Sequence, residues 1–223
     1  MSLVFAKEVI CGSCGYSFEE GDYVSTHSFG EMDLDTRPAP DYRFTMNEIL
    51  VTSCPVCHFC YQDITQFSPD FKRVMESSEY LSYVNHASLP SKAKEFLCKS
   101  LLLGHENKFV EAAWASLHAA WNCDDRYCIP ESITCRNKAI GLFLFCNYNK
   151  EQVFKDETEM TVFLIDLYRR SHNFKLALKL CNDVLALPIL KPQTRNIATF
   201  QLHLINKQDT QCYNIQDAIN FCN

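Results

Sequence analysis

The sequence predicts an α+β fold that is mostly α, with a small β-rich module first and an antiparallel α-helical array after it. Residues 1–68 contain two Cys-x-x-Cys pairs and two runs of β-forming residues, whereas residues 69–223 follow a helical period with short breaks. Four of the six glycines lie in the first 30 residues, so the second part contains few helix breakers. We therefore expect two domains, 1–68 and 69–223.

Two short strands are predicted in the first part. Residues 23–29 alternate large apolar and polar side chains, and residues 49–53 form a β-rich run that leads directly into the second cysteine pair. Between them, the prolines of Thr36-Arg-Pro-Ala-Pro-Asp are incompatible with a regular helix or a central strand. We expect this stretch to be an ordered excursion between the two cysteine pairs.

Helical periodicity begins near Ser68, where Ser68-Pro69 predicts an N-cap followed by the first helical residue. Ser91 is predicted to cap the next helix. The breaks between helices are short, so consecutive helices should pack antiparallel. The expected helices cover residues 69–84, 91–104, 108–122, 130–148, 157–171, 174–187, 191–206 and 214–222.

The segment 163–180 resembles a tetratricopeptide repeat. That repeat carries a large apolar residue, a tyrosine and a small alanine where two helices cross closely, and these places are filled by Leu164, Tyr168 and Ala177. Ile165 departs from the pattern, because the repeat prefers a small residue there. We expect an irregular tetratricopeptide-like array, and a plain α-helical bundle is the alternative.

The two cysteine pairs, Cys11-Gly-Ser-Cys14 and Cys54-Pro-Val-Cys57, have the spacing of zinc knuckles. In such a turn two thiolates point at one metal ion, and backbone amides donate hydrogen bonds to the sulfur atoms. Two knuckles supply four sulfur ligands, the full tetrahedral set of a structural Zn²⁺. The sequence therefore predicts a zinc-ribbon-like module whose metal ligands are Cys11, Cys14, Cys54 and Cys57.

The residues that follow the two pairs differ. Gly15 suits a turn that needs a positive φ angle, but His58 fills the equivalent place after the second pair. The spacer between the pairs is also longer than the roughly 15–20 residues of compact zinc sites. His58 and Cys60 are spare potential ligands, and we expect Cys60 to be a packed thiol near the metal.

Two other interpretations of the cysteine pairs stay open. They are two unrelated pairs of buried thiols, or a redox pair, although a thioredoxin-type pair lies in a βαβ unit that the sequence does not show. A closed four-thiolate site leaves no position for water, so we expect a structural zinc and no enzymatic activity. The sequence contains no phosphate-binding glycine loop and no recognisable catalytic triad.

Thirteen cysteines, most of them scattered through helical sequence, suit a reducing compartment. The start of the chain lacks the pattern of a signal peptide, and the apolar runs are far shorter than the roughly 20 residues that cross a bilayer. We expect a cytoplasmic protein with no membrane partner.

Charge is distributed unevenly along the chain. Residues 1–68 carry three basic and ten acidic residues, a formal balance of −7, while the remainder carries +1. Many zinc ribbons bind nucleic acid through basic surface, but an acidic module repels phosphate groups. The charge therefore disfavours nucleic acid as a partner.

The helical part contains further cysteines that invite a second metal site. Cys123, Cys128 and Cys135 do not have knuckle spacing and have no partner pair. We interpret them as packed thiols, beside loop acids at Asp124 and Asp125.

Two other groups of residues lie at helical spacing. Trp114, His118 and Trp121 lie at i, i+4 and i+7, which predicts a core stripe with a packed histidine. Arg169 and Arg170, together with the lysines that follow, predict a basic patch on a solvated helix face. An acidic partner segment is the functional alternative for that patch.

Taken together, the order of the parts resembles a bacterial family catalogued as domain of unknown function twenty-two twenty-five. The parts that carry the resemblance are the two knuckles, the stretch Ser-Thr-His-Ser-Phe-Gly-Glu-Met-Asp-Leu-Asp-Thr-Arg-Pro-Ala between them, and the helical array with Leu-Tyr-Arg-Arg-Ser-His-Asn-Phe near residue 170. The resemblance implies a cytoplasmic bacterial protein with a zinc ribbon followed by tetratricopeptide-like helices. It implies no activity.

These observations lead to one functional hypothesis and two alternatives. We expect a zinc-binding, non-enzymatic protein that serves as a protein–protein interaction scaffold, with a peptide or protein partner on the concave face of the array. A nucleic-acid-binding zinc ribbon and a thiol- or metal-responsive regulator are the alternatives.

Overall fold

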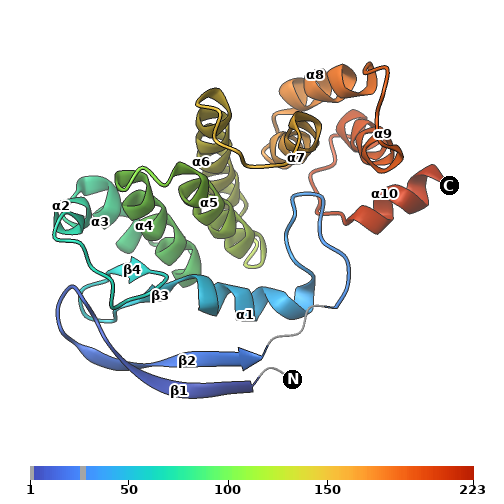
Figure 1. Cartoon of the computed structure of the whole chain (residues 1–223). Coiled ribbons are helices and arrows are strands. Elements are labelled where there is room, and N and C mark those ends of the chain that lie inside the picture. Colours follow the sequence, from blue (N-terminus) through green and yellow to red (C-terminus); the bar gives the residue numbers. More distant parts are fainter. Residues whose placement is uncertain (1–2, 26–28) are drawn as a thin grey trace.

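The computed structural model describes residues 3–25 and 29–223 and confirms an α+β class that is mostly α. An antiparallel hairpin of β1 (Leu3–Ile10) and β2 (Ser17–Ser25) lies beneath helix α1 (Pro40–Leu50), and a second short antiparallel pair of strands follows (Figure 1). The later elements are β3 (Thr52–Ser53), β4 (Cys60–Tyr61), α2 (Phe71–Met75), α3 (Ser78–Val84), α4 (Ser91–His105), α5 (Phe109–Asp124), α6 (Ile129–Tyr148), α7 (Glu157–Arg170), α8 (Phe174–Leu185), α9 (Pro192–Asn206) and α10 (Ile215–Cys222).

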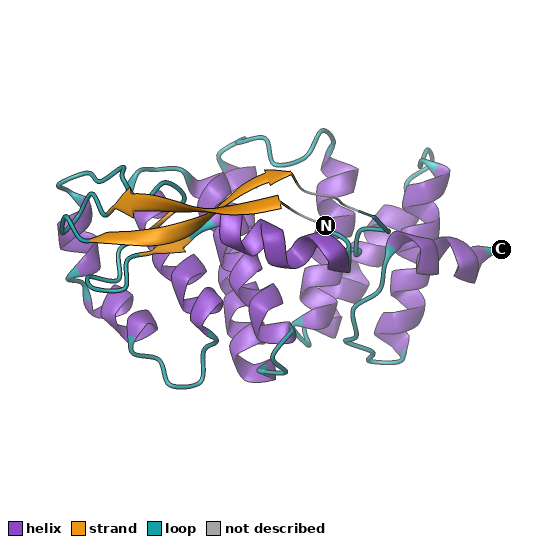
Figure 2. Cartoon of the chain, turned by 90° about the horizontal axis from the view of Figure 1, so that it is seen from below, coloured by secondary structure: helices purple, strands orange, loops and turns teal. Residues whose placement is uncertain are grey.

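The helices form a chain of neighbours in which each packs on the next. Helices α4, α5 and α6 lie side by side, and α7 to α10 continue the array toward the C-terminus (Figure 1). Seen from below, the hairpin and α1 run across the underside of the array (Figure 2). The short connections place consecutive helices antiparallel, as the sequence predicts.

The N-terminal module and the first helices share one hydrophobic core. Val9, Phe59 and Ile64 from the module belong to the same cluster of buried side chains as residues of α4 to α7. A second cluster fills the space between α7, α8 and α9, where Ala177 is fully buried and allows the helices to approach. The module is therefore held to the array by apolar packing as well as by polar contacts.

The predicted strand at 23–29 lies too late in the chain. β2 begins at Ser17, where it pairs with Ile10, because the first cysteine turn connects β1 directly to β2 and fixes the register of the hairpin. Residues 26–28 of the predicted strand lie outside the described residues, and Phe29 lies in a loop.

Helix α1 was not predicted, and it includes the first two residues of the second predicted strand. Of residues 49–53, only Thr52 and Ser53 form a strand, because Ile49 and Leu50 complete α1. Pro40 is the first residue of α1, a place where the missing N–H of proline costs nothing. The prediction that the proline-rich stretch contains no helix is therefore wrong at its last two residues.

The predicted helix at 69–84 is two helices. α2 begins at Phe71, two residues later than expected, and the chain breaks before α3 at Ser77, whose hydroxyl accepts a hydrogen bond from the N–H of Tyr80 at 3.2 Å. The predicted cap Ser91 is the first helical residue, and Pro90 precedes it as the N-cap. The other predicted helices agree with the structure to within about two residues at each end.

Residues 32–37, between β2 and α1, extend from the module to the C-terminal helices (Figure 1). The N–H of Leu34 donates to the carbonyl of Tyr213 at 2.8 Å, and Asp33 forms an antiparallel bridge with Asn214. The side chain of Leu34 packs in a third apolar cluster with Phe200 and Ala218. This stretch overlaps the predicted excursion, residues 36–41, only at Thr36 and Arg37, and it connects the N-terminal module to the C-terminal helices.

The same stretch supplies a carboxylate to a buried ionic cluster. Asp35, which is fully buried, accepts hydrogen bonds from the Arg170 guanidinium at 2.5 Å and from Trp121 Nε1 at 2.8 Å. Arg170 also pairs with Asp124 at 2.6 Å, and Asp124 pairs with Arg136 at 2.6 Å. These four charged groups neutralise one another inside the protein.

Two sequence interpretations are wrong here. Arg169 and Arg170 do not lie on a solvated face, since Arg169 is fully buried and pairs with Asp166 at 2.6 Å. Asp124 is not a loop acid, because it is the last residue of α5 and pairs with two arginines. The acids that meet Arg170 come from segments far away in sequence, which a local pattern cannot reveal.

Candidate metal centre

The two cysteine turns have the same backbone conformation. In the first, the N–H of Gly15 donates to the carbonyl of Cys11 at 2.8 Å, and in the second the N–H of His58 donates to the carbonyl of Cys54 at 3.0 Å. Gly15 and His58 have φ angles of 74° and 58°. His58 therefore adopts the left-handed conformation that glycine adopts in the first turn, although it carries a side chain.

The four predicted cysteines lie together. The Sγ atoms of Cys11 and Cys57 are 3.6 Å apart, as are those of Cys14 and Cys54, and all four sulfur atoms lie within 4.8 Å of one another. Four sulfurs about 2.3 Å from a tetrahedrally bound zinc are about 3.8 Å from each other. The donor set fits a four-coordinate metal ion without rearrangement of the backbone.

The four thiols differ in their access to solvent. Cys11 and Cys54 are buried, Cys57 is half-buried and Cys14 is exposed. Burial raises the pKa of Cys57 to about 12 and also raises the pKa of Cys11, whereas the backbone N–H of Tyr16 lowers the pKa of Cys14. A metal ion must displace protons from these sulfurs, so its affinity rises with pH.

The first cysteine turn is fixed to the chain that follows β4. The N–H of Gly12 donates to the carbonyl of Ile64 at 3.0 Å, and a Cβ atom at position 12 would lie 2.4 Å from the carbonyl oxygen of Thr65. Only glycine permits this approach. The contact fixes the first cysteine turn against the chain that follows the second turn.

The two spare ligands lie outside the sulfur cluster. Cys60 is 3% exposed, and its Sγ atom lies 3.2 Å from the carbonyl of His58 and 3.4 Å from the hydroxyl of Ser53. The same carbonyl of His58 accepts a hydrogen bond from the Tyr80 hydroxyl at 2.7 Å, and the His58 ring is exposed. In the described part of the chain, the metal-ligand cluster consists of the four predicted cysteines.

The other candidates from the sequence are structural. Cys123 and Cys135 are buried and Cys128 is half-buried, which confirms packed thiols. His118 is 9% exposed, stacks on Trp121 at 4.7 Å between ring centroids and contacts Phe96 edge-on, so the core stripe is confirmed.

Comparisons of the chain with protein-family models, with curated proteins and with solved structures found no match. None of the described helices is both long enough and apolar enough to cross a bilayer. Function must therefore be inferred from the geometry of the site itself.

Because the two turns are equivalent, adding a Cβ atom in the first turn and removing one from the second should change the free energy of unfolding in opposite directions. Gly15→Ala places a Cβ atom at a φ of 74° and should lower the free energy of unfolding by about 1–2 kcal/mol. His58→Gly removes the same backbone strain, but glycine also increases the conformational entropy of the unfolded chain. The net result should be a free energy of unfolding higher by about 0.5–1 kcal/mol. Chemical denaturation of the metal-loaded variants measures both changes, and a loss of stability in His58→Gly would show that the two turns are not equivalent.

Proposed function

We propose that this chain is a zinc-binding, non-enzymatic protein that acts as a protein–protein interaction scaffold in the cytoplasm, and that Zn²⁺ is its structural cofactor. The observation that carries the proposal is the cluster of four thiol sulfurs from Cys11, Cys14, Cys54 and Cys57. A tetrahedral site with four sulfur donors is typical of zinc or iron, and such a site has no open coordination position for a substrate.

The position of the cluster supports a structural role. It connects the hairpin of β1 and β2 to the short strands β3 and β4, none of which forms a large sheet of its own. A two-stranded hairpin is marginally stable alone, and bound metal can supply the missing free energy of folding. All thirteen cysteines are unpaired, which is typical of a protein from a reducing compartment.

The array supports the scaffold role. Its consecutive helices pack as antiparallel neighbours from α4 to α10, an arrangement in which extended surfaces bind partner segments. We also propose that the chain is a member of the bacterial family that it resembles, in which a zinc ribbon precedes tetratricopeptide-like helices.

Metal analysis of the protein purified from its host tests the proposal first. We expect one zinc and no iron per chain, no colour, and no change in zinc content after dialysis without chelator. Crosslinking in the host should then yield a partner that rebinds the purified, zinc-loaded protein in a defined ratio. Iron in the site would contradict the cofactor, and failure of every crosslinked protein to rebind would contradict the scaffold role.

A further inference from the structure

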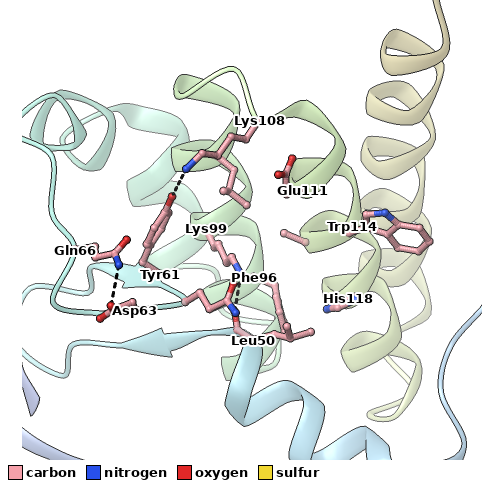
Figure 3. Close-up of a pocket in the computed structure, with 13 residues that line it drawn as sticks. Leu50, Tyr61, Asp63, Gln66, Phe96, Lys99, Lys108, Glu111, Trp114 and His118 are labelled. Carbon is pink, nitrogen blue, oxygen red and sulfur yellow. Dashed lines mark hydrogen bonds between the residues drawn. The ribbon is translucent and has the colours of Figure 1, made fainter. Parts of the chain in front are cut away.

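A cavity of about 530 Å³ lies between α4, α5, the end of α1 and the chain around β4 (Figure 3). Phe96, Leu103 and Leu50 provide apolar walls, while Lys108 and Gln66 lie toward its mouth. The cavity does not include the metal ligands. Its lining combines apolar side chains with several polar and charged ones, so it can hold a ligand that has both an apolar body and a charged group.

Lys99 on α4 lies inside this cavity and is 8% exposed. Its Nζ atom donates one hydrogen bond, at 2.6 Å, to the carbonyl of Leu50 at the end of α1 (Figure 3). Among the described residues, no carboxylate lies within 4.0 Å of Nζ. An ammonium group has three N–H donors, so two remain for another group.

The buried arginines of the chain show what Lys99 lacks. Each pairs directly with an aspartate, over distances of 2.5–2.6 Å, and these arginines are Arg37, Arg136, Arg169 and Arg170. A buried charge is costly unless an opposite charge lies against it. Burial lowers the pKa of Lys99 to about 8, and Glu111 only partly opposes that effect. At neutral pH Lys99 is therefore a mostly protonated ammonium group without a direct counter-ion.

A second unpaired group lies in the same cavity. His118, on α5, is 9% exposed, points from α5 toward the cavity (Figure 3), and its Nδ1 atom has no hydrogen-bond partner among the described residues. Burial lowers the pKa of His118 to about 3, so the ring is neutral and offers one donor and one acceptor. The charge of Lys99 acts on this ring and also lowers its pKa, so the two groups lie near each other in the cavity lining.

We propose that the cavity binds a monocarboxylate with an apolar body, whose carboxylate pairs with Lys99 and whose body lies against Phe96 and Leu103. One carboxylate matches one ammonium group. Glu111 and Asp63 also line the cavity and repel any anion, and this repulsion grows with the charge of the ligand, so phosphate esters are disfavoured more strongly than a monocarboxylate. A small free acid and the C-terminal residue of a peptide both present one carboxylate on an apolar body. Binding of either depends on neither the metal nor a protein partner.

Calorimetric titration of the zinc-loaded protein tests the proposal with two acids and their neutral amides. The probes are 3-phenylpropionate against 3-phenylpropanamide, and N-acetyl-alanyl-phenylalanine against its C-terminal amide. We expect saturable binding of at least one acid and at least tenfold weaker binding of its amide. If the free acid binds more tightly, the ligand is a metabolite-like acid; if the peptide does, it is a chain terminus. Absence of binding by both acids would overturn the proposal.

Two lysine variants test whether the carboxylate of the bound acid pairs with Lys99. Lys99→Met keeps the apolar stem and removes the charge, so it should weaken binding by about 30-fold or more. Lys175→Met, on the exposed surface of α8 and outside the cavity lining, is the control and should change affinity by less than about threefold. Equal losses in both variants would overturn the assignment.

A measurement on the unaltered protein covers the case in which Lys99→Met does not fold. Acylation with a small anhydride, followed by mass spectrometry of the peptides, gives the rate of modification of each lysine. Saturating 3-phenylpropionate, or the peptide acid if that binds instead, should protect Lys99 severalfold and leave Lys175, outside the cavity, unprotected. Unchanged modification of Lys99 with the site saturated would overturn the proposal.

Discussion

The variant Cys54→Ser is expected to lose the proposed zinc ion and to destabilise the module by on the order of 5 kcal/mol or more. Structural zinc sites in small domains contribute apparent binding free energies of about 10–16 kcal/mol at neutral pH. Serine is a poor zinc ligand, and Cys54 is fully buried, so the substitution also leaves a hydroxyl without a metal in the core. Metal content and thermal unfolding measure the two losses.

The effect should be greatest where the metal joins separate segments. Hydrogen exchange should accelerate in β1 to β4 and, because Phe59 and Ile64 pack in the core shared with the array, to a smaller degree in α4. Helices α8 and α9, which belong to a separate cluster, should keep their protection. Cys222→Ser, at an exposed cysteine, is the control and should behave as the unaltered protein. A Cys54→Ser protein with one zinc per chain and normal exchange would contradict a four-cysteine site.

The parts that sequence predicted well are those that depend on local pattern. The helices from 91 onward follow an apolar period that continues through each helix and stops at short polar breaks, so their limits are correct to about two residues. The cysteine spacing likewise encodes each turn on its own, so the sequence alone shows that His58 and Gly15 take equivalent places in the two turns.

The parts that were missed depend on contacts between distant segments. In α1 only Thr45, Met46 and Asn47 are buried, so its apolar period is too weak to distinguish a helix from a strand. Asp35 and Arg170 meet although they are 135 residues apart, and neither has a neighbour in sequence that marks it as buried. The cavity around Lys99 combines α1, β4, α4 and α5, and a single lysine on an amphipathic helix carries no sign of it.

Removal of the central arginine of the ionic cluster, Arg170→Met, should lower the free energy of unfolding by about 3–5 kcal/mol at pH 7. The variant leaves Asp35 fully buried without its cation and leaves Asp124 with Arg136 as its remaining arginine. The cost of a buried pair broken from one side comes mainly from the charge that stays behind. Lys175→Met, on the exposed surface of α8, is the control and should change stability by less than about 0.5 kcal/mol.

The pH dependence of the same variant separates the loss of a charge pair from the loss of packing. Burial alone would raise the pKa of Asp124, but Arg136 and Arg170 hold it below its usual range. A lowered pKa in the folded state contributes stability that is complete above the unfolded pKa, near 4, and is lost as the pH falls through the folded pKa. The difference between Arg170→Met and the unaltered protein should therefore be largest above pH 5 and shrink as the solution is acidified below pH 4. If the difference in the free energy of unfolding stays constant from pH 7 to pH 3, Arg170 stabilises the contact between residues 32–37 and the helices by side-chain packing and not by charge.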